Sequence, residues 1–251
     1  RGWTKEQRHT VIASYLGWTL DAFDFFLLVF LVTDVAKEFD TSVKTVTWAI
    51  TLTLALRPIG AFIFGRLADR YGRKPVMMID VLLYAGFGFL TAFAPSLTVF
   101  LVIRALFGIA MGGEWGVGAS LTMETIPAKS RGLVSGLLQA GSPSGLLLAS
   151  AVYGLLYSSI GWRGMFMVGL APALLVLYIR RYVPESPGFA PHHATGAGRT
   201  FTVLKRHWRL AIYAMIFMMA MNFFSHGTQD LFPTMLKVDH GLDPHLVSKI
   251  N

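Results

Sequence analysis

The sequence contains no cysteine and few charged side chains. The absence of cysteine excludes disulfides and cysteine metal sites within these 251 residues. Charged residues make up 14% and hydrophobic residues 54%, whereas soluble domains average about 25% and 45–50%. The sequence also offers no nucleophile triad, phosphate-binding loop or metal-ligand set, so we expect neither an enzyme nor a bound metal or cofactor. The composition predicts a protein whose main solvent is a lipid bilayer.

Apolar runs of about 20 residues, the length needed to cross a bilayer, recur along the chain and are joined by mostly short loops. We expect an all-α polytopic membrane fold in which residues 1–182 form a six-helix bundle and residues 183–209 form a cytoplasmic linker. Residues 210–251 would begin a second bundle. The first span is too long, and too interrupted by Asp21 and Asp24, to be a cleavable signal peptide. The seven expected spans are 11–33, 45–65, 75–94, 98–124, 133–156, 164–182 and 210–232.

Basic residues are distributed unevenly between the two sides of the expected membrane. Fifteen of the 22 Lys and Arg lie on one side, five lie on the other, and the remaining two, Arg57 and Arg104, lie within spans. The positive-inside rule therefore places the N-terminus in the cytoplasm. The net charge of +8 is explained by this asymmetry, so we expect a bilayer and not a nucleic acid as its partner. Short loops favour a bacterial inner membrane or a plasma membrane.

The chain starts without methionine and stops soon after an odd seventh span. We expect a truncated protein whose C-terminal helices are missing from this sequence. Any partner helices that follow span seven would be missing with them.

A row of polar residues lies at the end of the seventh span, where the sequence reads NFFSHGTQDLFPT. At 3.6 residues per turn, every fourth residue falls on one slowly drifting stripe of a helix. Desolvating an imidazole and a carboxylate inside a membrane is costly, so the stripe predicts a transport path or a proton site. Hydrogen bonding between helices is the alternative. The stripe comprises Asn222, His226, Asp230 and Thr234, with Ser225 and Gln229 beside it.

The loop after the second span reads GRLADRYGRK and resembles the signature loop of the major facilitator superfamily in nearly every position. A solvated turn that only sets topology would explain its basic residues but not its fixed Gly and Asp. The resemblance implies a latch on the cytoplasmic side, in which Asp69 caps a helix and Arg73 pairs with an acid such as Glu124 or Asp80. The expected gating residues are Gly65, Asp69, Arg70, Gly72, Arg73 and Glu124.

Weaker patterns agree with this superfamily. Arg104 with Gly108 and Gly112 resembles the pattern RxxxG of its fourth helix, and PESP at 184–187 resembles a motif of sugar porters. Glycines four residues apart allow helices to approach closely, so we expect Gly108 and Gly112 to serve packing more than binding.

The polar row matches the pattern NXX[S/T]HX[S/T]QDXXXT of the lactate/pyruvate:proton symporter group, within the sialate:proton symporter family. GWTLDAFDFF at 17–26 and GGEWGVG at 112–118 resemble the same family. The resemblance implies a twelve-helix facilitator that takes up a small monocarboxylate with protons and acts as a monomer. Sialic acid or another organic acid is the nearest alternative substrate. A passive channel and a transporter-derived receptor are further alternatives.

A carboxylate substrate needs a fixed positive partner, and arginine is suited to this because its planar fork binds both oxygens. Counting residues from the cytoplasmic edge leaves Arg57 as the deep arginine. We therefore expect Arg57 to bind substrate. The alternative is a buried ion pair with Asp21, Asp24 or Glu114, and the two are compatible if substrate displaces the acid. Further substrate contacts are expected from Asn222, Ser225, His226 and Gln229.

Proton coupling needs a group that is protonated with substrate and deprotonated without it. His226 and Asp230, one helical turn apart, are the leading pair. Asp24 and Glu114 come next, followed by Asp21, which could share a proton with Asp24. A structural hydrogen bond is the alternative role for each of these acids.

Overall fold

A computed structural model describes residues 2–187, 205–229, 232–238, 240–241 and 247. These residues form helices and connecting turns, without strands, which confirms the all-α prediction. The helices are α1 (Lys5–Glu38), α2 (Val43–Tyr71), α3 (Arg73–Thr91), α4 (Leu97–Thr125), η1 (Ala128–Ser130), α5 (Arg131–Gln139), α6 (Gly141–Val168), α7 (Ala173–Tyr182), α9 (Trp208–Gln229) and α10 (Phe232–Val238).

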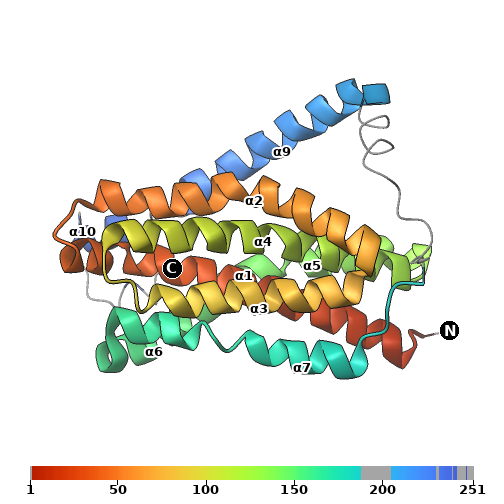
Figure 1. Ribbon diagram of the computed structural model, residues 1–251, viewed down its shortest axis with the longest axis horizontal. Coiled ribbons are helices and arrows are strands. Elements are labelled where there is room, and N and C mark those ends of the chain that lie inside the picture. The colour runs from red at the N-terminus through yellow and green to blue at the C-terminus, as the bar shows by residue number, and fades with distance from the viewer. Residues whose placement is uncertain (1, 188–204, 230–231, 239, 242–246, 248–251) are drawn as a thin grey trace.

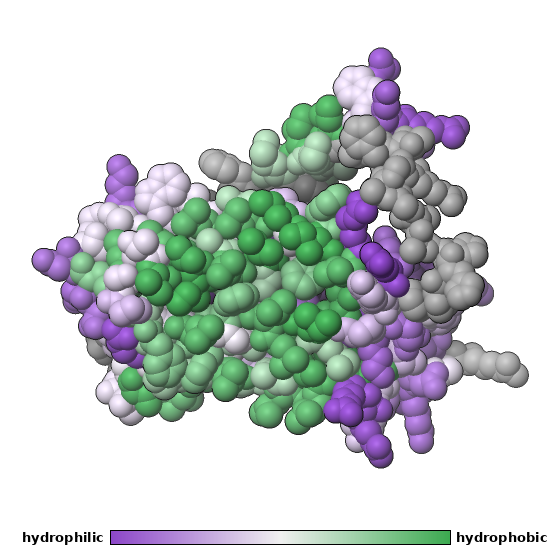
Figure 2. Space-filling model, viewed as in Figure 1, coloured by the Kyte–Doolittle hydropathy of each residue, from purple (hydrophilic) through white to green (hydrophobic). Residues whose placement is uncertain are grey.

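Five helical stretches are long and apolar enough to cross a membrane: α1 to α4 and the stretch Ala128–Val168. Figure 2 shows a broad apolar band across the middle of the visible face, with hydrophilic residues gathered at its two ends. Large apolar side chains such as Trp48, Phe62 and Leu155 are exposed. A band of this extent suits lipid as its surroundings, so the chain is a multi-pass membrane protein.

The helices run alternately up and down between two ends of the molecule. We call the end that holds the α2–α3 connection the basic end, because Arg66, Arg70, Arg73 and Lys74 gather there, and the other end the opposite end. Figure 1 shows α1 to α4 side by side, whereas α9 leans away from α2 toward the basic end. The α9 helix therefore approaches the others at the opposite end.

A glycine divides the fifth expected span from the sixth. Gly161, within α6, has φ 64°, and the helix kinks there. This left-handed conformation is available to glycine at little cost. The kink lies between the expected spans 133–156 and 164–182, and the second of these is completed by α7 after an irregular turn.

The core centres on α1, whose residues between Asp21 and Val32 are all buried. Helices α2 and α4 pack closely through glycines: a Cβ on Gly60 would lie 1.7 Å from the carbonyl oxygen of Ile109, and one on Gly108 would lie 2.3 Å from that of Thr53. The packing role expected for Gly108 is therefore observed. The contact fixes the α2 backbone just where Arg57 projects.

Candidate functional site

The interior of the bundle holds an unusual number of ionisable side chains for a membrane-spanning protein. Each is at most 2% exposed, although four of them are acids. Charged groups at this depth are costly and mark functional sites by default. The five residues are Asp21 and Asp24 from α1, Asp80 from α3, and Arg104 and Glu114 from α4.

Arg57 on α2 faces Asp21 on α1. Its Nη2 lies 3.4 Å from Asp21 Oδ2, and the Asp21 side chain is fully buried while that of Arg57 is 20% exposed. The Arg57 guanidinium also lies over the ring of Trp18, 5.4 Å from its centre. The sequence offered two roles for Arg57, substrate binding or an ion pair, and the structure places it in the ion pair.

Arg104 is the most completely buried arginine of the described residues, although it lies nearer the end of its helix than Arg57 does. Its side chain is fully buried. The guanidinium lies 4.7 Å from the ring centre of Phe107 and 4.6 Å from that of Phe166. The guanidinium nitrogens have no hydrogen-bond partner among the described residues, and Asp24 is the acid with which Arg104 interacts electrostatically.

The carboxyl group of Asp24 lies against two glycines. A Cβ on Gly169 would lie 2.7 Å from its Oδ1, and one on Gly88 would lie 3.4 Å from its Oδ2. Asp24 therefore points toward α3 and the turn after α6, while Asp21 points toward α2. The two acids have different cationic neighbours, and the expected sharing of one proton between them stays a prediction.

Glu114 and Asp80 form a second acidic region between α1, α3 and α4. A Cβ on Gly17 would lie 1.9 Å from Glu114 Oε1, and one on Gly113 would lie 2.6 Å from Asp80 Oδ1. Neither carboxyl group has a hydrogen-bond partner in the described part of the chain. Asp80, named above as a possible partner of Arg73, lies in the interior instead.

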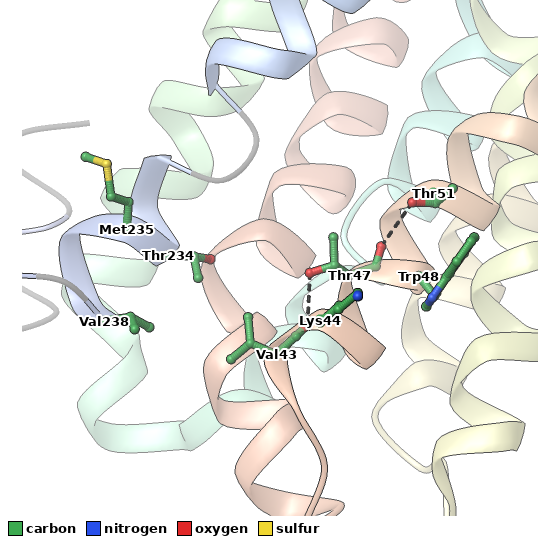
Figure 3. A pocket seen from close by; sticks show the side chains of 8 residues that line it. All are labelled: Val43, Lys44, Thr47, Trp48, Thr51, Thr234, Met235 and Val238. Carbon is green, nitrogen blue, oxygen red and sulfur yellow. Dashed lines mark hydrogen bonds between the residues drawn. The ribbon is translucent and has the colours of Figure 1, made fainter.

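The first part of the polar stripe, through Gln229, lies on α9, whose backbone is helical to that residue. The side chains of residues 222–229, and Asp230 as a whole, lie outside the described residues. Thr234, the last residue of the stripe, is described and buried in α10. It lines a pocket of about 530 Å³ with Val43, Thr47 and other residues at the start of α2. Figure 3 shows α10 and α2 on two sides of this pocket.

The signature loop forms an ion-pair network at the basic end. Arg73 Nη2 donates to Glu124 Oε1 at 2.7 Å, and its Nη1 lies 3.4 Å from Asp69 Oδ1. Gly72 has φ 102°, a conformation that favours glycine. Gly65 and Arg70 lie on α2, which leads into this turn, and Arg70 lies over the ring of Tyr71.

Glu185 joins this network, a role that the sequence analysis missed. Its Oε1 accepts a hydrogen bond from the backbone N–H of Arg73 at 2.8 Å, and Oε2 accepts one from that of Lys74 at 3.2 Å. A carboxylate at a helix N-terminus satisfies free N–H groups and the helix dipole. Its place in PESP, where a sugar-porter motif was noted, was the available signal.

Metal ligation finds no support in the part of the chain that the structure describes, where no group of three or more His, Asp or Glu is placed to hold an ion.

The fold and the buried ionisable residues define a multi-pass helical membrane protein with a polar interior. Residues 14–249 match the Major Facilitator Superfamily. The chain therefore belongs to this superfamily, whose members are membrane transporters rather than enzymes.

Curated relatives are transport proteins. The chain is 37% identical over 188 residues to a probable 4-methylmuconolactone transporter of Cupriavidus pinatubonensis, covering 73% of this chain and 44% of that protein. It is 29% identical over 246 residues to the sialic acid transporter NanX of Escherichia coli, covering 97% and 60% respectively. The chain thus spans about half the length of these relatives.

Solved structures share the fold. The D-xylose-proton symporter superposes with a TM-score of 0.76 at 19% identity, over 97% of this chain and 64% of that chain. A bacterial homologue of the human lysosomal transporter Spinster gives a TM-score of 0.73 at 19% identity, over 98% and 59%. The described helices correspond to part of a facilitator fold.

Proposed function

We propose that the whole protein is a proton-coupled symporter of a small monocarboxylate such as lactate or pyruvate. The observation that carries this proposal is the pair between Arg57 and Asp21, in which a partly exposed guanidinium reaches a fully buried acid. An incoming carboxylate offers the guanidinium two oxygens in a bidentate arrangement, which is stronger than a single contact at 3.4 Å.

Exchange of partners at Arg57 couples substrate to proton. When a substrate carboxylate takes the guanidinium, the buried Asp21 loses its cationic partner, and an unpaired buried charge is strongly disfavoured. Asp21 therefore takes up one proton as the substrate binds. Release of substrate on the other side of the membrane reverses both events, so one proton crosses with one anion.

Trp18 is suited to position the substrate. Its ring lies beside the guanidinium of Arg57, and its Nε1 is buried without a hydrogen-bond partner in the described residues. An indole N–H that is buried usually finds an acceptor. We propose that this N–H donates a hydrogen bond to the bound acid, either to its second carboxylate oxygen or to its 2-hydroxy or 2-oxo group.

Further residues are proposed to carry protons or to contact the substrate. His226 and Asp230 remain the proposed proton carriers of the seventh span, and Asn222, Ser225 and Gln229 remain its proposed substrate contacts, on the sequence pattern given above. Asp24 is a further candidate because Arg104 interacts with it. Glu114 has no such cation beside it, so we rank it after Asp24.

The basic end faces the cytoplasm in this proposal, with the N-terminus on the same side. The concentration of Arg and Lys in the α2–α3 connection supports this orientation through the positive-inside rule. The network of Arg73, Asp69 and Glu124 then forms the cytoplasmic latch, with Gly72 at the turn and Gly65 and Arg70 on the end of α2 that leads into it.

Uptake of labelled lactate by the full-length protein in membrane vesicles tests the function. We expect accumulation that follows an imposed inward proton gradient and that an uncoupler abolishes. Uptake that ignores both the gradient and the uncoupler would contradict proton coupling and favour a passive channel. Absence of any flux of organic acids would favour a receptor.

Sialic acid is the second candidate substrate, and the similarity to a protein named sialic acid transporter supports it. Competition separates the two, because excess pyruvate should block lactate uptake fully while excess sialic acid should not. The reverse pattern would assign the larger acid.

A further inference from the structure

A lysine in α10 reaches across to α1 and α6 at the opposite end of the molecule. Lys237 Nζ lies 3.6 Å from Asp34 Oδ2 and donates a hydrogen bond of 2.5 Å to the carbonyl of Phe30. The same ammonium group lies 4.7 Å from the ring centre of Tyr153 and 5.8 Å from that of Tyr157. We call these five residues the Lys237 cluster.

The cluster excludes most solvent. The side chains of Lys237 and Asp34 are only 12% and 16% exposed, so water screens their attraction less than it would on an open surface. An ammonium group over aromatic rings gains further stabilisation when it is desolvated. The contact is therefore stronger than an ordinary surface ion pair.

Asp34 has a partner within the first bundle in addition to Lys237. Asp34 also accepts a hydrogen bond of 2.5 Å from the hydroxyl of Tyr157, so it keeps a partner within its own bundle if α10 moves away. All the contacts of Lys237 described above are with α1 and α6. Separation would return Lys237 to water and leave Asp34 with the Tyr157 hydrogen bond to Oδ1 but without a cation at Oδ2. The contact therefore favours the closed arrangement of this end.

The Lys237 cluster joins different parts of the molecule from the ion pairs of the basic end. Helix α10 follows α9, where the second bundle begins, and Figure 1 shows α10 beside the α1–α2 connection while the far end of α9 stands away from α2. The ion pairs of the basic end, such as Arg73 with Glu124, join helices of the first bundle. The Lys237–Asp34 pair joins the first bundle to the start of the second.

We propose that the Lys237 cluster is the external gate of the transporter, and that separation of Lys237 from Asp34 is required for the substrate path to open outward. The proposal rests on the orientation given under Proposed function, because that orientation makes the opposite end external. Removal of the ammonium group shifts the population toward the outward-open state.

Accessibility of a buried thiol on α10 tests the gate without any transport assay. Thr234 is buried in α10 beside the start of α2, so Thr234→Cys in the full-length protein, with any other cysteine replaced, reports outward opening. A membrane-impermeant maleimide is added outside right-side-out vesicles. The exposed α2 residue Thr51 gives the reference variant Thr51→Cys, which measures the reactivity of the reagent at this end.

We expect Lys237→Gln to raise the labelling rate of the Thr234→Cys thiol about tenfold, the ratio expected from loss of a hydrogen bond to a charged group. Lys237→Arg should raise it less, because the positive charge remains. Asp34→Asn should act in the same direction, and its effect should not add to that of Lys237→Gln because both remove one contact. Lys44→Gln, an exposed lysine at the same end, is the matched control and should change nothing.

Two results would overturn the gate. One is an unchanged labelling rate in Lys237→Gln when Thr51→Cys is labelled normally from outside. The other is an equal increase in Lys44→Gln, which would reduce the effect to surface charge. If Thr51→Cys reacts only from inside, the orientation is wrong and the cluster is not external, whatever lactate uptake shows. If labelling follows the expectation but no acid is transported, the proposed substrate fails and the gate stands.

Discussion

The carbonyl oxygen of Arg57 lies 2.1 Å from the position that a Cβ on Gly112 would occupy. Helices α2 and α4 therefore touch backbone to backbone at the residue that carries the proposed substrate ligand. Because small residues at such crossings govern helix association in membranes, the position of the Arg57 guanidinium depends on a residue that binds nothing itself.

Gly112→Ala should accordingly destabilise the protein and disturb the site. Forcing a methyl group into a filled contact costs about 1–3 kcal/mol. Thermal unfolding in detergent measures the loss, and Gly116→Ala on the same helix is the control, because a Cβ on Gly116 would meet nothing within 4 Å. Equal melting temperatures for the two variants would show that α4 can shift away from α2 freely.

Arg57→Lys should weaken substrate binding strongly while it preserves the charge. A lysine cannot bind both oxygens of a carboxylate in a planar fork, and loss of one charge-assisted hydrogen bond corresponds to about 1.5–3 kcal/mol. The apparent affinity for lactate, measured from the concentration dependence of uptake, checks this. An unchanged affinity would assign Arg57 a structural ion pair only.

Asp21→Asn should abolish accumulation against a gradient while exchange of substrate across the membrane persists. The amide keeps the volume of the side chain but can no longer take up and release the proton that the proposed cycle requires. Counterflow of labelled lactate, compared with uptake driven by a proton gradient, separates the two activities. Asp230→Asn in parallel shows which acid carries coupling, because full accumulation in either variant removes that residue from the role.

Arg104→Leu should destabilise the fold more than it alters substrate affinity. It removes the cation that interacts electrostatically with the buried Asp24, and a buried charge without a compensating cation is strongly disfavoured. The double variant Arg104→Leu with Asp24→Asn should recover much of the loss, because the uncompensated charge is then absent. Thermal unfolding of the three variants tests this. A double variant no more stable than Arg104→Leu would assign the cost to lost packing against Phe107 and Phe166.

The order of the helices could be predicted from apolar run lengths, since a bilayer permits few alternatives. The pairing of Arg73 with Glu124 could be proposed because charge at a membrane edge has few partners within reach. The burial of Arg104 could not be predicted from the sequence. One of the two rings around its guanidinium belongs to Phe166, which lies 62 residues further along the chain in α6. Such a pocket depends on how α4 and α6 pack, which local sequence patterns do not encode.

The partner of Arg57 could be predicted only in part from the sequence. Depth along the spans put Asp21, Asp24 and Glu114 in one layer, and distance along a helix axis is all that counting residues can supply. The direction in which each acid points decided between them, and that direction follows from close glycine contacts such as Gly17 against Glu114.

The cap that Glu185 makes on α3 determines where the connection between the two proposed bundles begins. The chain is anchored beneath α3 at Glu185, and the next described helix starts at Trp208. The 22 residues between these points could extend to roughly 75 Å, more than twice the thickness of a bilayer core. In the transporter proposed above, a connection with this reach would not limit the movement of the second bundle against the first, so that limit would come from contacts between helices. Shortening this connection by several residues should therefore leave the turnover rate unchanged.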